Sequence, residues 1–318
     1  MPGMTPSRHV LLITAAGTGV GWAYALTLSQ QFPEAGLVTA DTNPAAWCSA
    51  AQFAKHHEHW ASFTADAAYI ERLNALVKQH GVTHYLPIID PEIDFAARHR
   101  AEIACEVLAP ASNFTALALA KDRYHAELGR LGIDSPRTLS RADIAAGQVG
   151  IAKCPGSFGG RATWRIERPE QLDALPANAF VQECLPGSEF TADCFPLADG
   201  SVFVSVRERV ETKSGVCTKA RIAPNPTMQD MAERLVRGYG LRTPFCFQAM
   251  SDGAARLAVT DINPRLGAGT LMSAANGGDF FGAHLASVFG TPVGDRLQRH
   301  HERCSVTRQY VELLTATE

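Results

Sequence analysis

The chain has 318 residues, of which 46% are hydrophobic and 19% charged, and its formal net charge is −3. At roughly 100 to 200 residues per domain this length predicts two or three domains, and the apolar content excludes a disordered chain. The near-neutral charge excludes a nucleic-acid binder that works by neutralising phosphates, and no apolar stretch reaches the roughly 20 residues that a membrane span requires. We therefore expect neither a nucleic acid nor a membrane as a partner.

Eight cysteines are scattered along the chain and never form a Cys-x-x-Cys pair. Disulfide frameworks are typical of short secreted chains, so this scatter favours reduced thiols. The apolar run that begins at Val10 is too short for a signal peptide and is not followed by a small-residue cleavage site. We expect a cytoplasmic enzyme or binding protein.

Residues 1–110 alternate apolar runs with helical patterns. The apolar runs are 10–16, 37–40, 84–89 and 107–109. Continuous runs of this length are typical of strands that are buried on both faces of a parallel sheet. Apolar residues at helical spacing from Tyr69 stop at Gly81, and a second helical pattern spans 93–103. These patterns predict a small parallel α/β sheet with helices on both faces.

From residue 111 the pattern changes to one long helical stretch and many short strands. The helical stretch is 114–131, and the strand-like segments are 149–153, 161–167, 180–184, 189–195, 201–210, 245–250 and 256–263. Turns of sequence Ala-Asp-Gly at 198–200 and Ser-Asp-Gly at 251–253 predict two hairpins. The Pro-Asn-Pro segment at 224–226 resembles a linker. This half is predicted to be antiparallel α+β.

A first glycine cluster, Gly-Thr-Gly-Val-Gly at 17–21, lies between a predicted strand and a predicted helix, and Asp41 follows it by about 20 residues. Dinucleotide-binding turns have this arrangement, because glycines let the pyrophosphate approach a helix N-terminus. Trp22, however, occupies the position where helix and strand packing needs a small residue. We therefore predict a tight turn without a dinucleotide, and an oxidoreductase is the least favoured alternative.

A second glycine cluster follows Lys153, which ends a predicted strand. Glycines at 156, 159 and 160 surround Ser157 and Phe158. Such a loop can turn backbone amides toward a phosphate while the lysine adds a fixed cation, although a glycine-rich hairpin needs no ligand. The Gly-Lys-Ser/Thr ending of a P-loop is absent.

Oxygen donors lie at the end of the segment 256–263. Alternation along a strand places Asp261 and Asn263 on one face, and Gln248 joins them if the hairpin turn is centred near residues 254 and 255. Such oxygens suit Mg²⁺, and Arg265 just beyond could bind an anion. Turn chemistry at a strand end explains Asp261 and Asn263 equally well.

Two other groups of charged residues are less specific. Alternation along 201–210 places Ser205, Arg207 and Arg209 on one face, where Arg209 is the better site candidate and a solvated strand face is the alternative. Histidines at 56, 57 and 59 are interpreted as surface residues, because adjacent side chains point in different directions.

In order and spacing, these motifs resemble the ATP-grasp superfamily, and within it the carbamoyl-phosphate-synthase-like and carboxylate-amine ligase members. The resemblance covers nearly the whole chain and implies a mixed α/β and α+β fold. A parallel-sheet pre-ATP-grasp domain would span 1–110. A two-lobed ATP-grasp fold would follow, with its first lobe at 111–185 and its second, carrying the metal site, at 186–318.

The resemblance also implies roles for individual residues. The cofactor-binding residues would be Lys121, Lys153, Gly156, Ser157, Gly159, Gly160, Gln182, Glu183, Leu185 and Glu189. Of these, the lysines would contact phosphates, the loop would cover them, backbone groups around Glu183 and Leu185 would pair with adenine, and Glu189 would bind the ribose. Gln248, Asp261 and Asn263 would be the metal ligands. Arg265 and Arg209 would be the catalytic residues.

The implied activity is an ATP-dependent ligase that activates a small carboxylate as an acyl phosphate and couples it to an amine, with ATP and Mg²⁺ or Mn²⁺ as cofactors. Two alternatives stay open: carboxyphosphate-forming or kinase-like phosphoryl transfer, and an ATP-binding sensor with weak turnover. Asp261 stands where most members carry Glu, and Gln248 where many carry an acid, which leaves open whether one metal ion binds or two. Many relatives dimerise, so a homodimer is compatible with the resemblance.

Overall fold

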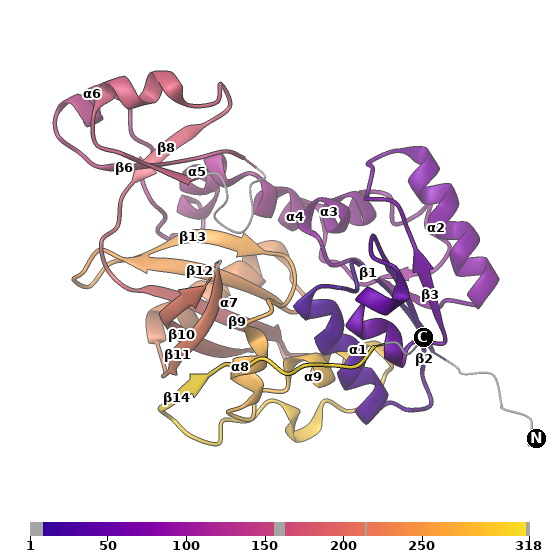
Figure 1. The fold of residues 1–318 in the computed structure, drawn as a ribbon. Helices are drawn as coiled ribbons and strands as arrows, with labels where there is room; N and C mark the ends of the chain where they lie inside the picture. Colours follow the sequence, from indigo (N-terminus) through magenta and orange to yellow (C-terminus); the bar gives the residue numbers. More distant parts are fainter. Residues whose placement is uncertain (1–8, 156–162, 214, 316–318) are drawn as a thin grey trace, which may run out of the picture. The chain divides into compact units, whose positions relative to one another are not determined.

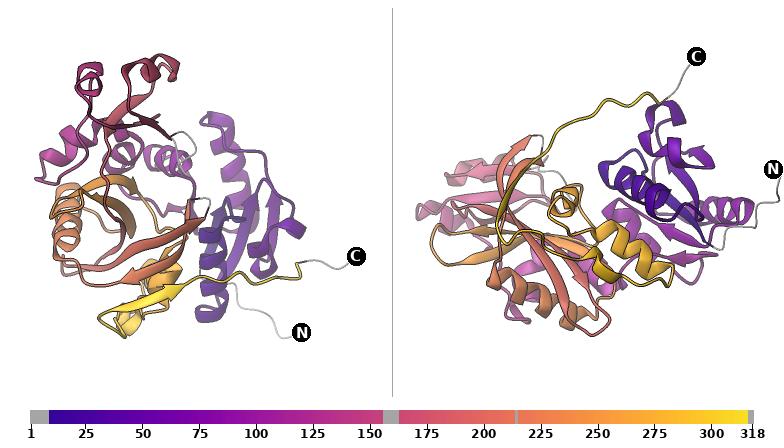
Figure 2. Two further views of the ribbon diagram at one scale, coloured as in Figure 1. Left: turned by 60° about the vertical axis from the view of Figure 1, so that its left-hand side comes forward. Right: turned by 90° about the horizontal axis from the view of Figure 1, so that it is seen from below.

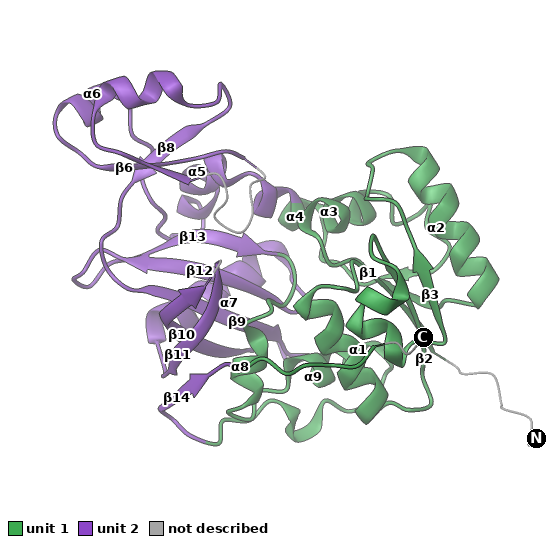
Figure 3. Ribbon diagram, in the orientation of Figure 1, with its two compact units in different colours: residues 1–115, 264–300, 309–318 green, residues 116–263, 301–308 purple. Residues whose placement is uncertain are grey.

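The structure is a computed structural model that describes residues 9–155, 163–213 and 215–315. The chain divides into two compact units, which Figure 3 shows in different colours. Unit 1 comprises Met1–Thr115, Pro264–His300 and Gln309–Glu318, and unit 2 comprises Ala116–Asn263 and His301–Arg308. The polypeptide thus returns to unit 1 late in the sequence, whereas three consecutive segments were predicted. We describe each unit by itself.

Unit 1 is built on a parallel sheet of five strands (Figure 1). The strands are β1 (Val10–Thr14), β2 (Gly36–Asp41), β3 (His56–His59), β4 (His84–Leu86) and β5 (Glu106–Val107). Their order is β3-β2-β1-β4-β5, and every neighbouring pair is parallel. The four apolar runs are confirmed as strands. The histidines at 56, 57 and 59 form the edge strand β3, which has no apolar signal in the sequence.

Helices cover both faces of this sheet, as the views in Figure 2 show. The helices of unit 1 are α1 (Gly19–Gln31), α2 (Ala67–His80), α3 (Asp90–Arg98), α8 (Thr270–Ala274) and α9 (Phe280–Val288), with 3-10 turns η1 (Ala45–Trp47), η2 (Ser49–Phe53) and η5 (Gly294–Arg296). Helix α2 begins at its N-cap Asp66 and ends at Gly81, which adopts the left-handed conformation with φ of 62°. Glycine tolerates that conformation because it has no Cβ, so the predicted stop at Gly81 is confirmed.

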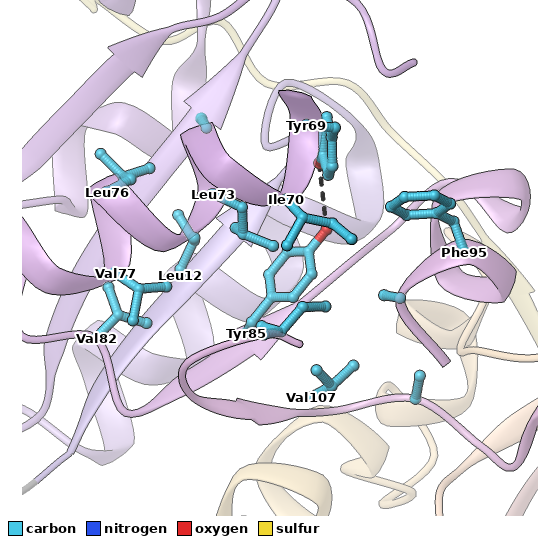
Figure 4. Close-up of a cluster of buried hydrophobic side chains, with 14 of the residues drawn as sticks. Leu12, Tyr69, Ile70, Leu73, Leu76, Val77, Val82, Tyr85, Phe95 and Val107 are labelled. Atoms are coloured by element: carbon cyan, nitrogen blue, oxygen red, sulfur yellow. Dashed lines mark hydrogen bonds between the residues drawn. The ribbon is translucent and has the colours of Figure 1, made fainter. Parts of the chain in front are cut away.

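A core cluster joins α2 and α3 to one face of the sheet (Figure 4). Figure 4 shows Tyr69 from α2 and Tyr85 from β4 pointing toward each other, with their hydroxyl oxygens 3.3 Å apart. Both hydroxyls donate to Oε1 of Glu92 in the first turn of α3, from Tyr85 at 2.5 Å. Glu92 is only 1% exposed, so this core holds a carboxyl group as well as apolar side chains.

We expect Glu92 to make the stability of the protein depend on pH. Burial raises its pKa, whereas hydrogen bonds from Tyr69, Tyr85 and Thr14 act in the opposite direction. Since the folded state then binds a proton that the unfolded state releases, stability is greatest at acidic pH and falls as the pH rises toward the folded pKa. Glu92→Gln should remove this loss, so its melting temperature should gain on that of the wild type as the pH rises above about 4.3, the ordinary pKa of a glutamate. Parallel pH profiles of the two proteins would contradict this, and exposed Glu71→Gln is the control.

Residues 264–300 belong to unit 1 because their helices bury apolar surface there. Helix α9 has seven buried residues, among them Phe281 and His284. Phe281 packs edge-on against Tyr24 of α1, with ring centroids 4.8 Å apart, and the Tyr24 hydroxyl lies 2.6 Å from Nδ1 of His284. Burial lowers the pKa of His284 to about 4, so its ring is neutral at physiological pH. A helix that is apolar on all sides gives no sequence signal for which partner it packs against.

Unit 2 contains a six-stranded antiparallel sheet. Its strands are β9 (Glu189–Pro196), β10 (Val202–Lys213), β11 (Val216–Ile222), β12 (Phe245–Ser251), β13 (Leu257–Asn263) and β14 (Cys304–Thr307), in the order β13-β12-β9-β10-β11-β14. Both predicted hairpins are confirmed. Helix α7 (Pro226–Tyr239) packs on β9 and β10. The predicted linker at 224–226 is wrong, because Asn225 caps α7 with its side chain and Pro226 opens its first turn.

A smaller sheet completes unit 2. Its strands are β6 (Gly150–Lys153), β7 (Thr163–Ile166) and β8 (Phe180–Glu183), with α6 (Arg141–Ala145) and η4 (Pro169–Ala174) beside them. The predicted single helix at 114–131 is wrong: the segment forms α4 (Ser112–Leu119), η3 (Lys121–Arg123) and α5 (Tyr124–Gly129). Buried Tyr124 accounts for the break, because its hydroxyl donates to the Ala118 carbonyl at 3.1 Å and accepts from the Ile262 amide at 3.1 Å. In the described residues, no helix is both long and apolar enough to cross a membrane.

Candidate functional site

Polar side chains from four strands gather on one face of the six-stranded sheet. Gln248 on β12 lies directly opposite Asp261 on β13, as predicted, and opposite Thr191 on β9. Cross-strand partners project to the same face, so β9, β12 and β13 contribute to one surface. Arg209 on β10 joins it through Glu189 on β9, with Nη1 and Oε1 2.5 Å apart.

The three predicted metal ligands make contacts with other site residues. Oδ1 of Asp261 lies 2.6 Å from Nζ of Lys121, and Nδ2 of Asn263 donates to Oδ2 of Asp261 at 3.2 Å. The Gln248 amide, oriented to suit its neighbours, donates to Glu189 at 3.3 Å and accepts from Arg209 at 3.0 Å. The Lys121 ammonium thus neutralises Asp261 at the place where a bound cation is expected.

Lys153 at the end of β6 belongs to the same group. Burial lowers the pKa of its ammonium, and the nearby charge of Lys121 lowers it further, while Asp261 and Glu189 act in the opposite direction. Two ammonium groups that repel each other inside a protein favour an anion between them. The structure therefore brings together Lys121, Lys153, Glu189, Arg209, Gln248, Asp261 and Asn263, all in unit 2.

The predicted adenine segment lies at the end of β8. Gln182 and Leu185 are buried, at 3% and 8% exposure. Glu183 is occupied by internal contacts: its side chain accepts from Nη2 of Arg256 at 2.7 Å and from the Arg137 amide at 2.9 Å, and its own amide donates to the Arg137 carbonyl at 2.9 Å. Burial acts to raise the pKa of Glu183, but these hydrogen bonds prevail and lower it. Any adenine contact of Glu183 would thus use its backbone carbonyl.

The predicted role of the glycine-rich loop is not tested by the structure. Gly156, Ser157, Gly159 and Gly160 lie outside the described residues. Their expected role over the phosphates stays a prediction.

Arg265 lies in unit 1, whereas Arg209 lies in unit 2. Its Nε is 3.0 Å from Oδ1 of Asp90, in the first turn of α3, and its Nη1 donates to the Leu266 carbonyl at 3.1 Å. Arg265 is thus held beside a carboxylate within its own unit.

The first glycine cluster forms a tight turn that uses its acidic residue internally. Oδ2 of Asp41 accepts from the Gly17 amide at 2.8 Å, and Oδ1 accepts from both nitrogens of Asn43. A Cβ on Gly21 would come within 2.7 Å of the Ala16 backbone, so close packing of the turn requires this glycine. The contacts of Asp41 give the cluster a structural role that needs no dinucleotide.

Sequence reasoning missed one buried ion pair on the same sheet. Arg207 is 2% exposed and donates to both oxygens of Asp193, from Nε at 3.1 Å and from Nη2 at 2.8 Å. The alternative of a solvated strand face is wrong for Arg207. The sequence does contain a signal for this ion pair. In the predicted hairpin, Asp193 is the direct cross-strand partner of Ser205, two residues before Arg207 on the same face of the strand.

One family model matches part of the chain in sequence. Residues 176–311 match the model of a family described as ATP-grasp in the biosynthetic pathway with Ter operon. None of the curated proteins matches the chain in sequence.

Solved structures share the fold at low sequence identity. The biotin carboxylase domain of 2-oxoglutarate carboxylase from Hydrogenobacter thermophilus, in complex with MgADP, ADP and bicarbonate, matches 91% of this chain and 72% of its own, with a TM-score of 0.73 and 12% identity. N5-carboxyaminoimidazole ribonucleotide synthetase from Thermotoga maritima matches 92% and 78%, with a TM-score of 0.70 and 15% identity. N5-carboxyaminoimidazole synthetase from Staphylococcus aureus, complexed with ADP, matches 91% and 79%, with a TM-score of 0.73 and 14% identity. Residues 176–311 thus match an ATP-grasp family model, and the chain shares its fold with these solved structures.

Proposed function

We propose that the protein is an ATP-dependent ligase that activates a small carboxylate as an acyl phosphate and couples it to an amine. The observation that carries this proposal is the cluster in unit 2 in which Lys121 and Lys153 lie close to Asp261. A polyphosphate would offset the repulsion between the two ammonium groups, and charge-assisted contacts of this kind are strong. The ADP and MgADP in the solved neighbours support the same nucleotide.

ATP would then bind at the cofactor-binding residues that were predicted from the sequence. Lys121 and Lys153 would contact the phosphates beneath the loop of Gly156, Ser157, Gly159 and Gly160. Glu189 would exchange its contact with Arg209 for the ribose hydroxyls. The adenine would lie against the end of β8, at Gln182, Glu183 and Leu185.

The residues present fit a magnesium site that depends on ATP. Mg²⁺ is usually held by one or two carboxylates together with phosphate oxygens. Asp261 would supply one carboxylate, and Gln248 and Asn263 would supply amide oxygens. The Lys121 ammonium, 2.6 Å from Asp261, supports a position that favours positive charge. A bound ion would neutralise the charge of the polyphosphate.

The reaction would proceed by two displacements. A carboxylate oxygen of the substrate attacks the γ-phosphorus and ADP leaves; the amine nitrogen then attacks the acyl carbon, loses a proton, and phosphate leaves. Negative charge develops on the transferred phosphoryl group and on the tetrahedral intermediate, and guanidinium groups stabilise such charge. We assign this role to Arg265 and Arg209.

A second candidate reaction is the phosphorylation of bicarbonate to carboxyphosphate. It is favoured by the bicarbonate bound in the Hydrogenobacter thermophilus neighbour. The two reactions differ in the acid that stimulates ADP release, which is an organic carboxylate in the first and bicarbonate in the second.

The test is an ADP-release assay with MgATP and a panel of carboxylic acids, each with and without amines, in bicarbonate-free buffer. The ligase proposal predicts ADP release that requires one organic acid, together with an amide product. ADP release that depends on bicarbonate alone would favour the second candidate. If no acid stimulates ADP release, both are wrong.

Lys121→Met should lower the affinity for ATP and raise the affinity for a divalent metal ion in the absence of ATP. Removal of a phosphate contact should weaken ATP binding by roughly tenfold or more, the usual size for a charged hydrogen bond. Without ATP, however, Mn²⁺ should bind more tightly, because Asp261 loses the ammonium 2.6 Å away that competes with the ion. Calorimetry with ATP and electron paramagnetic resonance with Mn²⁺ measure the two affinities. Weaker Mn²⁺ binding in the variant would contradict the assignment of Asp261 as a ligand.

A further inference from the structure

Arg256, just before strand β13, joins the two sheets of unit 2 at the predicted adenine segment. Its Nη2 donates to Oε1 of Glu183 at 2.7 Å, and its Nε donates to Oδ2 of Asp134 at 2.5 Å. The side chains of Arg256, Glu183 and Asp134 are 32%, 21% and 43% exposed, so the cluster is partly buried. One guanidinium thus holds the end of β8, in the small sheet, against the hairpin of β12 and β13 in the large sheet.

The chain just beyond Leu185 is held against the turn of the same hairpin. The Gly187 amide donates to the Ser251 carbonyl at 2.9 Å. A Cβ on Gly187 would lie 2.6 Å from that carbonyl oxygen, so this close approach requires glycine. Arg256 is anchored to the turn as well, because its amide donates to Oδ1 of Asp252 at 3.2 Å. Both ends of the segment 183–187 are therefore fixed by residues of one hairpin.

The end of β8 also runs antiparallel to the segment 137–139, and its pairing there is irregular. The Glu183 amide donates to the Arg137 carbonyl at 2.9 Å. In an antiparallel ladder, opposite residues exchange both hydrogen bonds, so the Arg137 amide is expected to donate to the Glu183 carbonyl in return. It donates instead to the side-chain oxygen Oε1 of Glu183, at 2.9 Å. The usual donor to this carbonyl is thus engaged by the Glu183 carboxylate, which Arg256 holds in place.

We propose, building on the function proposed above, that Arg256 is a positioning residue for the adenine of ATP. Held by Arg256, the Glu183 carboxylate keeps the Arg137 amide, and the Glu183 carbonyl accepts a hydrogen bond from the 6-amino group of the base. Without Arg256 the carboxylate turns toward solvent, because a charge that has lost its partner is better hydrated there. The Arg137 amide then returns to the carbonyl and takes the place of the base. Arg256 acts through Glu183 and needs no contact with the nucleotide.

The experiment compares ATP with purine riboside triphosphate, which lacks the 6-amino group, by calorimetric titration of the full chain with Mg²⁺. The wild type should bind ATP roughly 3- to 10-fold more tightly than the analogue, the usual size of one uncharged hydrogen bond. Arg256→Met should bind ATP more weakly and should bind the two nucleotides with nearly equal affinity. A residue that only supports the fold would weaken the binding of both nucleotides alike and leave their ratio unchanged.

Variants of Glu183 test the same step with Arg256 intact. Glu183→Ala removes the acceptor that engages the Arg137 amide, so it should also lose the preference for ATP. Glu183→Gln should retain the preference, because a carboxamide oxygen accepts the same hydrogen bond. Arg237→Met is the control, since it removes an exposed arginine of unit 2 and should leave both affinities unchanged.

If Arg256→Met does not fold, the two Glu183 variants decide the matter. A wild type that binds both nucleotides equally would overturn the inference while the ligase proposal stands. A folded Arg256→Met or Glu183→Ala variant that keeps the full preference for ATP would do the same. If the wild type binds neither nucleotide, the proposed function fails and the inference fails with it.

Discussion

Replacement of Lys153 by Met is expected to weaken ATP binding by roughly 10- to 100-fold, which corresponds to the loss of one charged hydrogen bond of about 1.5–3 kcal/mol. Lys153 is partly buried at the end of β6, and burial and Lys121 together lower its pKa. A bound polyphosphate relieves that electrostatic strain, so the ammonium contributes more with ATP than without it. Removal of the charge should leave stability unchanged or slightly improved, because the repulsion with Lys121 disappears.

Calorimetric titration with ATP and Mg²⁺ measures this effect. Lys213→Met is the matched control, because it removes an exposed lysine from β10 in the same unit and should leave ATP affinity unchanged. If both variants bind ATP as tightly as the wild type, Lys153 does not contact the nucleotide. A large fall in the melting temperature of Lys153→Met would instead assign the lysine a structural role.

The second large effect is expected from Arg207→Met. Removal of one partner of a buried ion pair typically costs about 3–5 kcal/mol, because the remaining charge has no compensation. Asp193, which is 0% exposed, would keep its charge without the two hydrogen bonds from Arg207. For a unit of this size, the melting temperature should fall by roughly 6–20 °C.

Thermal unfolding followed by circular dichroism checks this result. Arg130→Met is the control, because its ion pair with Glu127 is exposed and such pairs contribute about 0–1 kcal/mol. The double variant Arg207→Met with Asp193→Leu should recover much of the loss, because no buried charge remains. A single variant that melts within 1–2 °C of the wild type would show that the pair does not stabilise unit 2.

The parts of the fold that the sequence predicts well are those with local signals. The apolar runs before residue 110 identify the central strands, because a strand buried on both faces has no polar side. The hairpin turn is centred near residue 254, close to the centre assumed for the prediction, and Gln248 pairs with Asp261 beside a register shift between Gln248 and Ala249. Local chemistry of this kind needs no knowledge of the rest of the chain.

Other features depend on contacts between residues far apart in the sequence. Helix α9 packs against α1, although most of the sequence of unit 2 lies between the two helices along the chain. Its apolar surface does not indicate which element it packs against. The edge strand β14 has four residues and pairs with β11, about 80 residues earlier in the sequence. Tyr124 breaks a helical pattern because the distant amide of Ile262 donates to its hydroxyl.

Some features of the candidate site likewise follow from local sequence patterns, whereas others depend on contacts between distant residues. The strand positions of Lys153, Gln248 and Asp261 follow from local patterns, and the ATP-grasp resemblance suggests that they belong together. The ion pairs Lys121 with Asp261 and Arg265 with Asp90 could not be predicted, because each joins segments of more than 100 residues' separation. These ion pairs can be identified only from the three-dimensional positions of the strands and helix termini.

Transfer of an oxygen atom from the substrate to phosphate tests directly whether a carboxylate attacks ATP. The carboxylate that supports ADP release is labelled with ¹⁸O and incubated with MgATP, the amine and the protein. The phosphate released is then analysed by mass spectrometry. The proposed mechanism predicts one ¹⁸O atom in each phosphate, because the bridging oxygen of the acyl phosphate comes from the carboxylate and leaves with the phosphorus. Unlabelled phosphate formed at the same rate as ADP would mean that no carboxylate oxygen reaches the released phosphate, and the proposed mechanism would then be wrong.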